Sequence, residues 1–128
     1  MTTILIIEDY KNQRLLYEQE LRLEGYEILT AADGKETLEK VQEQLPEIII
    51  MNIPEMDSIE IMGRILNKHK DIPIIIHTAY SNYKDKFMSW AADAYIIKSS
   101  DLSELKNKIK EILTNKKLEY SKLNVAIS

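Results

Sequence analysis

The most constraining feature of this sequence is a short apolar run, Ile48–Met51, that stops abruptly at Asn52. An unbroken run of mostly β-branched residues is typical of a strand buried on both faces of a parallel sheet. Pro54 follows, and Asp57 with Glu60 then indicates a helix start in which Asp57 is the N-cap. Asn52 therefore lies at the carboxyl end of a buried strand, where ligands bind in doubly wound sheets.

The same order of strand and helix recurs along the chain. Apolar runs and amphipathic stretches predict five strands and five helices in alternation. Besides 48–51, the expected strands are 4–7, 26–31, 72–79 and 94–97, and the expected helices are 11–24, 33–45, 57–70, 81–91 and 101–117. Such alternation implies right-handed crossovers with helices on both faces of the sheet. We therefore expect an α/β fold with a doubly wound five-stranded parallel sheet, order 2-1-3-4-5, the flavodoxin-like three-layer sandwich.

Length and composition place the chain among single-domain globular proteins. Its 128 residues suffice for one core, and 45% hydrophobic with 30% charged residues is the balance of a soluble protein. A net charge of −4 argues against direct nucleic-acid binding, and the absence of cysteine excludes disulfides, thiol catalysis and cysteine-ligated zinc. With no signal peptide and no apolar run of membrane-spanning length, we expect a cytoplasmic protein without membrane contact.

The helical patterns also predict burial and the end of the domain. On the first helix the expected apolar stripe, an imperfect one, is Leu15, Leu16, Leu21 and Leu23. The last helix has the cleanest stripe, with Asp101 as its expected N-cap. Because the pattern fades beyond Lys117, we predict a domain over 1–117 and a loose tail or the start of a linker over 118–128.

Polar residues follow the ends of four of the expected strands. They are the acids Glu8 and Asp9, the amide Asn52, the hydroxyl of Thr78 and the ammonium of Lys98. In a parallel sheet the carboxyl ends of the strands meet along one edge, so these groups should lie together. Carboxylates bind hard divalent cations, and a hydroxyl with a lysine can hold phosphoryl oxygens.

Over roughly residues 3–116 the chain resembles the receiver domains of bacterial two-component response regulators. The matching features are the acidic pair, Arg14 and the segments 25–34, 53–61, 74–80 and 92–98. The resemblance implies that an Asp after the third strand would accept phosphate from a histidine kinase, that Glu8 and Asp9 would bind Mg²⁺, and that Thr78 and Lys98 would contact the phosphoryl group. An aromatic residue on the fifth strand, here Tyr95, would report the change to partners.

The sequence departs from this family at the phosphoacceptor. The family places its Asp six residues after a proline like Pro46 and four before one like Pro54, but here these prolines are eight apart with no Asp between them. Counting forward puts Asn52 at the acceptor position, and counting back puts Ile50 there. The Ile50 register would move Glu47 into the buried strand, where an unpaired carboxylate is costly. We therefore favour Asn52 and keep Ile50 as the alternative.

Three functions compete for this sequence. They are a phosphorylatable switch, a receiver-like binding module that has lost the chemistry, and a nucleotide- or flavin-binding enzyme. The enzyme ranks last because acids after the first strand repel phosphate unless a metal intervenes. Neither Asn nor Ile can form the acyl phosphate that Asp forms. We predict a pseudo-receiver in phosphorelay signalling that is not an enzyme and binds Mg²⁺ weakly or not at all, the alternative being a switch that uses a displaced acid such as Asp9 or Asp57.

The expected partners are proteins. They are a histidine kinase or phosphotransfer protein, a downstream output protein, or a second copy of the chain. Receiver relatives commonly use the surface of the fourth helix, fifth strand and last helix, which here carries Tyr83, Trp90, Tyr95 and Lys106. We expect that Tyr95→Ala would weaken partner binding and leave the fold intact.

Overall fold

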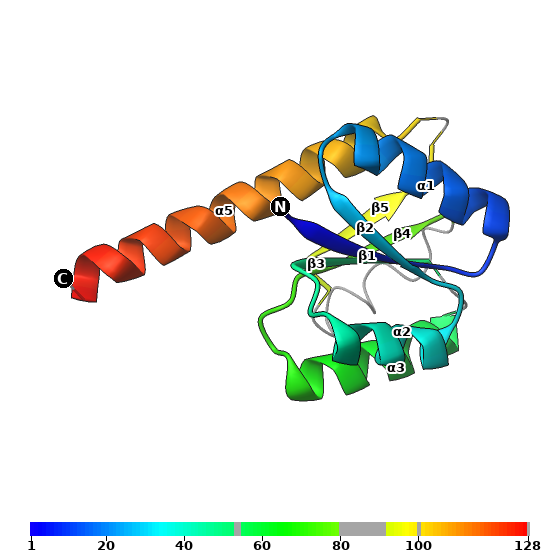
Figure 1. Cartoon of the computed structure of the whole chain (residues 1–128), viewed down its shortest axis with the longest axis horizontal. Coiled ribbons are helices and arrows are strands. Elements are labelled where there is room, and N and C mark those ends of the chain that lie inside the picture. The colour runs from blue at the N-terminus through cyan, green and yellow to red at the C-terminus, as the bar shows by residue number, and fades with distance from the viewer. Residues whose placement is uncertain (53–54, 80–91, 100, 128) are drawn as a thin grey trace.

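The computed structural model describes residues 1–52, 55–79, 92–99 and 101–127, where strands and helices alternate (Figure 1). The described strands are β1 (Thr3–Glu8), β2 (Glu27–Ala31), β3 (Ile48–Asn52), β4 (Ile74–Thr78) and β5 (Ala94–Ile97). The described helices are α1 (Lys11–Leu23), α2 (Gly34–Glu43), α3 (Glu55–Lys68) and α5 (Ser103–Ile127). All pairings are parallel and the strand order is β2-β1-β3-β4-β5, which confirms the predicted fold. The helix predicted over 81–91 lies outside the described residues.

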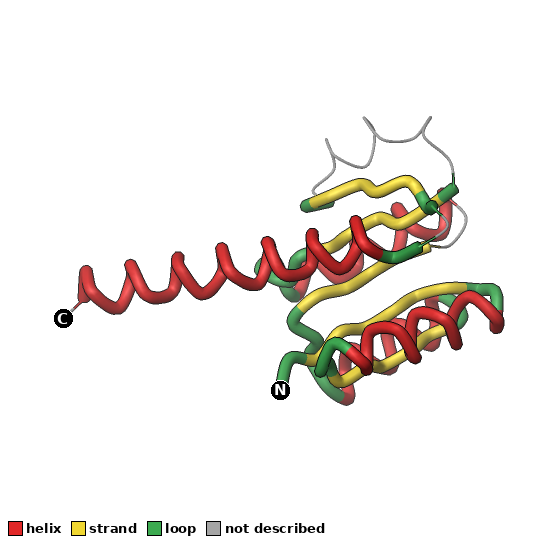
Figure 2. The backbone as a smooth tube through the Cα atoms, turned by 90° about the horizontal axis from the view of Figure 1, so that it is seen from above, coloured by secondary structure: helices red, strands yellow, loops and turns green. Residues whose placement is uncertain are grey.

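The sheet is buried on both faces, which explains why its strands appear in the sequence as unbroken apolar runs. Successive side chains of a strand point to opposite faces. Ile4 and Ile6 of β1 belong to the core beneath α1 and α5, whereas Leu5 and Ile7 belong to the core beneath α2 and α3. The two pairs of helices lie on opposite faces of the sheet (Figures 1 and 2). The ends of the strands, which the helices do not cover, are therefore where polar side chains can gather in contact with solvent.

Capping residues define the ends of several helices, and one of them is Asp101, the N-cap that the sequence predicts for the last helix. The Asp33 carboxylate accepts the Glu36 N–H at 2.9 Å, and the Glu36 carboxylate accepts the Ala32 N–H at 3.1 Å. At the end of α1, Gly25 has φ +94°, a conformation that favours glycine. At α5 the Asp101 carboxylate accepts the Ser103 N–H at 2.9 Å, the bond expected of its cap.

The predicted start of α3 is wrong by two residues. The helix begins at Glu55, so Asp57 lies within its first turn and is not the N-cap. Acidic residues anywhere in a first turn are favoured by the helix dipole, and this explains how a helix can begin before the Asp that resembles its cap.

The predicted apolar stripe of α1 is also largely wrong. Leu15 and Leu16 are each 44% exposed and Leu23 is 84% exposed, whereas Tyr17 and Leu21 are buried. Leucine forms helices well whether or not it is buried, so the number of leucines on α1 indicates a helix without indicating its buried face.

The last helix is longer than predicted. The segment 118–127, expected to be a loose tail or the start of a linker, continues α5 as helix to Ile127. This part of α5 extends away from the sheet and its covering helices (Figures 1 and 2). No glycine or proline interrupts α5, and lysine, leucine and glutamate sustain helix without burial. In the described part of the chain, none of the helices has the length and apolar character needed to cross a membrane.

Candidate functional site

The carboxyl ends of the strands form the candidate site. Glu8 is the last residue of β1 and lies opposite Asn52, the last residue of β3. Lys98 directly follows β5, and its main-chain N–H donates to the Thr78 carbonyl oxygen at the end of β4 at 2.7 Å. The parallel sheet therefore brings together the strand ends that the sequence predicted to meet.

The Glu8 carboxylate is the centre of a network of hydrogen bonds. It is fully buried, and its Oε1 accepts from the Asn52 amide Nδ2 at 2.7 Å and from the Lys98 Nζ at 2.9 Å. Its Oε2 accepts the Tyr10 N–H at 3.2 Å. Burial raises the pKa of Glu8, but the hydrogen bonds from Lys98, Asn52 and Tyr10 outweigh burial and hold the pKa below its ordinary value. Glu8 is therefore an ionised buried carboxylate whose charge is met from within the chain.

Asp9 differs from Glu8 although the two are adjacent. Asp9 is exposed, and partial desolvation together with the Glu8 carboxylate raises its pKa. The turn that carries both acids is held by Arg14, whose Nη1 donates to the carbonyl oxygens of Glu8 at 2.9 Å and Asp9 at 3.1 Å. Arg14 thus fixes the backbone of the acidic pair.

These residues can be tested as ligands of Mg²⁺. The ion accepts one or two carboxylates and keeps several waters, so Glu8 and Asp9 fit it in number and type. However, one oxygen of Glu8 already accepts from Lys98 and Asn52. Within the described ranges no cluster of three or more His, Cys, Asp or Glu side chains could hold a metal ion. Glu8 and Asp9 would therefore supply at most two carboxylates to a cation, and the Lys98 ammonium already lies 2.9 Å from one oxygen of Glu8.

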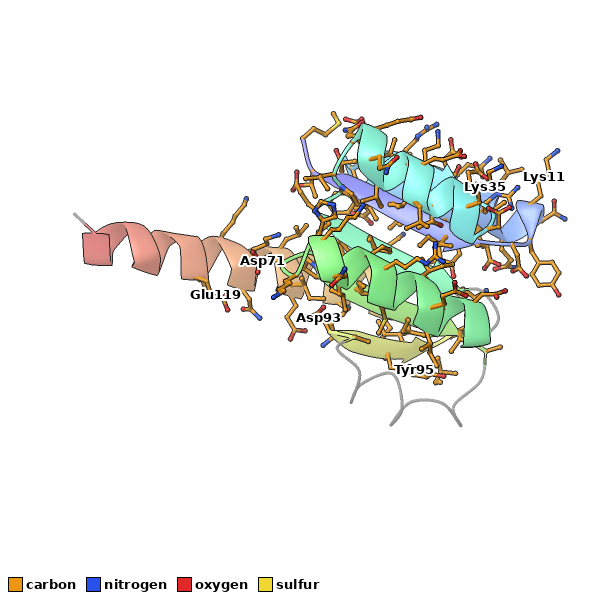
Figure 3. All side chains as sticks on the ribbon, turned by 90° about the horizontal axis from the view of Figure 1, so that it is seen from below. Lys11, Lys35, Asp71, Asp93, Tyr95 and Glu119 are labelled. Carbon is orange, nitrogen blue, oxygen red and sulfur yellow. The ribbon has the colours of Figure 1, made fainter. Side chains whose placement is uncertain are left out.

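The residues predicted for the interface are not all on one surface. Tyr95 is 9% exposed and belongs to the core on the α2–α3 face of the sheet (Figure 3). The Lys106 ammonium is 2.8 Å from Glu20 of α1 and 3.5 Å from Glu24, which directly follows α1, so it links α5 to α1. Because its ring is part of the core, we now expect truncation of Tyr95 to destabilise the fold, contrary to the expectation from the sequence. Tyr83 and Trp90 lie outside the described residues.

The sequence interpretation missed a buried polar pair next to the site. It gave no role to His77 or Tyr17, but the His77 Nδ1 lies 2.5 Å from the Tyr17 hydroxyl, and both side chains are buried. The Lys98 Nζ lies 5.8 Å from the centre of the Tyr17 ring. Burial, and then the charge of Lys98, lowers the pKa of His77 to about 4, and burial raises that of Tyr17. Two features of the sequence could have indicated this pair. His77 is a polar residue in an apolar strand, and Tyr17 lies four residues before Leu21, which is one helical turn away on the same face of α1.

Comparison with known proteins agrees with this fold. Residues 4–110 match the family model of the response regulator receiver domain. The response regulator ArlR of Staphylococcus aureus is 38% identical over 117 residues, which cover 88% of this chain and 53% of ArlR. The chain thus spans about half the length of the curated relatives it matches.

Solved structures show the same fold. The response regulator TrrA from Thermotoga maritima, crystallised in complex with Mg²⁺–BeF, is 42% identical with a TM-score of 0.79, covering 87% of this chain and 98% of TrrA. A chain in the structure of the histidine kinase ThkA in complex with TrrA is 43% identical, also with a TM-score of 0.79, covering 88% of this chain and 99% of that one. The chemotaxis protein CheY4 of Vibrio cholerae is 27% identical with a TM-score of 0.77, covering 87% and 98%.

Proposed function

This chain belongs to the response regulator receiver domain family, and on that premise we propose that it is a signalling domain whose phosphoacceptor position holds Asn52. Such a domain is not phosphorylated in the usual way and acts through protein–protein contacts. The observation that carries the proposal is the position of Asn52, at the carboxyl end of β3 with its amide bonded to the Glu8 carboxylate. An amide lacks the nucleophilic oxygen needed for an acyl phosphate.

The alternative acceptor position, Ile50, has less support. Its side chain is 1% exposed and belongs to the core between the sheet and α1, together with Tyr17 and Leu21. A side chain buried there does not reach the strand ends, where Glu8 and Lys98 lie. The burial of Ile50 supports the Asn52 assignment.

Lys98 replaces an external cation as the counter-charge at this edge. If Mg²⁺ bound at this edge, Glu8 and Asp9 would hold it, and in a receiver that is phosphorylated such an ion would offset the charge of the incoming phosphoryl group. Lys98 and Asn52 already stabilise Glu8 as an anion, so a cation gains less by binding than it would at a bare acidic pair. We therefore propose that Mg²⁺ binds weakly, and that Thr78 and Lys98 are family positions retained without phosphoryl transfer.

The proposed partners follow from the family. TrrA forms a complex with the kinase ThkA, and we propose that this chain likewise docks a histidine kinase or phosphotransfer protein, or a downstream output protein. Self-association through the surface of β5 and α5 is a second proposal, for which the exposed Ile97 at the end of β5 offers an apolar contact. Cross-linking with and without the kinase would separate these two modes.

Treatment with acetyl phosphate and Mg²⁺, followed by mass spectrometry of the intact chain and its peptides, tests the proposal. We expect no aspartyl phosphate on the wild-type chain, while a receiver that has its acceptor Asp is labelled in the same reaction. The donor must meet a carboxylate oxygen in line with its phosphorus, and Asn52 has none to offer. An aspartyl phosphate on Asp9 or Asp57 would overturn the proposed function in favour of a displaced acceptor.

A further inference from the structure

Lys98 is held between two groups on different elements. Its ammonium is 2.9 Å from the Glu8 carboxylate at the end of β1 and 5.8 Å from the centre of the Tyr17 ring on α1. Only 20% of the Lys98 side chain is exposed. An ammonium over an aromatic face is attracted by the ring, and more strongly when both are shielded from water. The position of the Tyr17 ring therefore influences where Lys98 rests.

The Tyr17 ring is anchored to the sheet. Tyr17 and His77 are 2% and 3% exposed, and they lie in an otherwise apolar region beneath α1. The Tyr17 hydroxyl bonds the His77 Nδ1, and the two rings meet edge to face with their planes at 71°. A buried hydroxyl or imidazole without a partner is costly, so each group requires the other. Because β4 fixes His77, it also fixes the orientation of the Tyr17 ring.

The structure also offers Lys98 a second place. A pocket of about 330 Å³ lies between α1 and the start of α5, and Lys98 lines it together with Glu20 and Asp101. Glu20 already pairs with Lys106 at 2.8 Å, and Asp101 already accepts the Ser103 N–H, so the carboxylates of this pocket are partly engaged. An ammonium that left Glu8 would be surrounded by these carboxylates and by solvent.

We propose that Tyr17 and His77 are positioning residues that hold the Lys98 ammonium on Glu8 and so keep the acidic pair closed to Mg²⁺. The inference deepens the proposed function, on which it rests for the assignment of Glu8 and Asp9 as cation ligands. The hydrogen bond to His77 fixes the Tyr17 ring, and the ring favours one position of the Lys98 ammonium. In that position Lys98 occupies an oxygen of Glu8 that a cation would need.

The position of Lys98 can be measured without any metal. Lysine ammonium groups give ¹H–¹⁵N NMR signals when hydrogen bonding slows their exchange with water, and Lys98→Met assigns the Lys98 signal. We expect this signal in the wild type, severalfold faster exchange in Tyr17→Phe, which loses only the bond to His77, and loss of the signal in Tyr17→Leu. Tyr26→Leu, at a half-buried tyrosine beside the same core, is the matched control and should leave the signal unchanged. Equal exchange in wild type, Tyr17→Phe and Tyr17→Leu overturns the proposal.

Mg²⁺ titration by calorimetry completes a double-mutant cycle. Tyr17→Leu should tighten Mg²⁺ binding about three- to tenfold when Lys98 is present, in line with the strength of a shielded cation–π contact, and should have no effect in Lys98→Met. An equal effect in both backgrounds means that Tyr17 does not act through Lys98, and it overturns the proposal. Labelling of the wild type by acetyl phosphate would refute the proposed function alone, because the NMR comparison does not depend on it.

Discussion

Asn52→Asp tests the candidate site most directly, because it replaces one amide group at the end of β3 by a carboxylate. The Asn52 amide now donates to the Glu8 Oε1 at 2.7 Å. Its loss removes a hydrogen bond to a charged group, which costs about 1.5–3 kcal/mol. It also places two carboxylates side by side, at about 4 kcal/mol for unit charges 4 Å apart in partly shielded surroundings. Lys98, 2.9 Å from the same oxygen, offsets part of this repulsion. We expect a net loss of about 2–4 kcal/mol in the free energy of unfolding without metal.

Mg²⁺ should reverse most of this loss. A third carboxylate at the edge raises the charge available to the cation, and we expect affinity for Mg²⁺ to rise at least about tenfold. Binding to the folded state alone adds about 2.7 kcal/mol when the free ion exceeds the Kd a hundredfold. The variant should therefore be less stable than wild type in EDTA and close to it in excess Mg²⁺.

Urea denaturation followed by circular dichroism, in EDTA and in Mg²⁺, measures both effects. Asn115→Asp on the exposed part of α5 is the matched control, because it makes the same change in charge far from the strand ends. The control should show little dependence on Mg²⁺. If Asn52→Asp is as stable as wild type in EDTA, or gains nothing from Mg²⁺ relative to the control, the site assignment is wrong and Ile50 becomes the acceptor position.

Three further predictions concern stability, each measured by urea denaturation. Folding lowers the pKa of His77 to about 4 from the value of 6.5 in the unfolded chain, so unfolding takes up a proton between these pH values. The free energy of unfolding of the wild type should therefore fall by about 3 kcal/mol as the pH falls from 6.5 to 4. His77→Leu should lack this part of the pH dependence. An unchanged pH profile in His77→Leu would contradict the burial of a neutral imidazole. Gly25→Ala should destabilise the folded protein by about 1 kcal/mol because the φ angle of Gly25 is +94°. Gly63→Ala, on an exposed part of α3, should stabilise it by about 0.5–1 kcal/mol. Equal effects of the two substitutions would refute the role of the φ angle. Tyr95→Ala should cost about 3–5 kcal/mol as a large-to-small change in the core, and a wild-type urea midpoint would place the ring outside it.

The fold was predictable because the sequence signals were about burial and caps. Strands such as Ile48–Asn52 have apolar residues on both faces, and only a parallel sheet covered by helices buries both. Asp101 marked the start of a helix because the chemistry of a cap is local. The meeting of Glu8, Asn52 and Lys98 followed from the topology alone, since parallel strands end at one edge.

The contact between Tyr17 and His77 could not be predicted from the sequence, because it depends on which face of a helix packs against the sheet. Tyr17 and His77 are 60 positions apart, and their contact requires that α1 turn one particular face to the sheet. The leucines of α1 suggested a different face, because leucine is frequent on exposed helix surfaces as well. The length of α5 was missed for a related reason. Hydrophobic periodicity reports burial, so a helix that continues into solvent leaves no periodic signal.

Because α5 is long, a small tilt of its anchored part produces a larger displacement at its far end. Its 25 residues correspond to about 37 Å at 1.5 Å per residue, and it is anchored to the sheet by Leu105 and Ile109 near one end. The 14 residues after Leu113 reach about 21 Å further, so a tilt of about 10° at the anchored end moves the tip by about 4 Å. Ion pairs connect the anchored part of α5 to the neighbouring helix α1. Lys106 pairs with Glu20 of α1, and both Lys106 and Lys110 pair with Glu24, which directly follows α1. A tilt that displaces the anchored side chains by about 1 Å would thus become a displacement of about 4 Å at the far end of the helix.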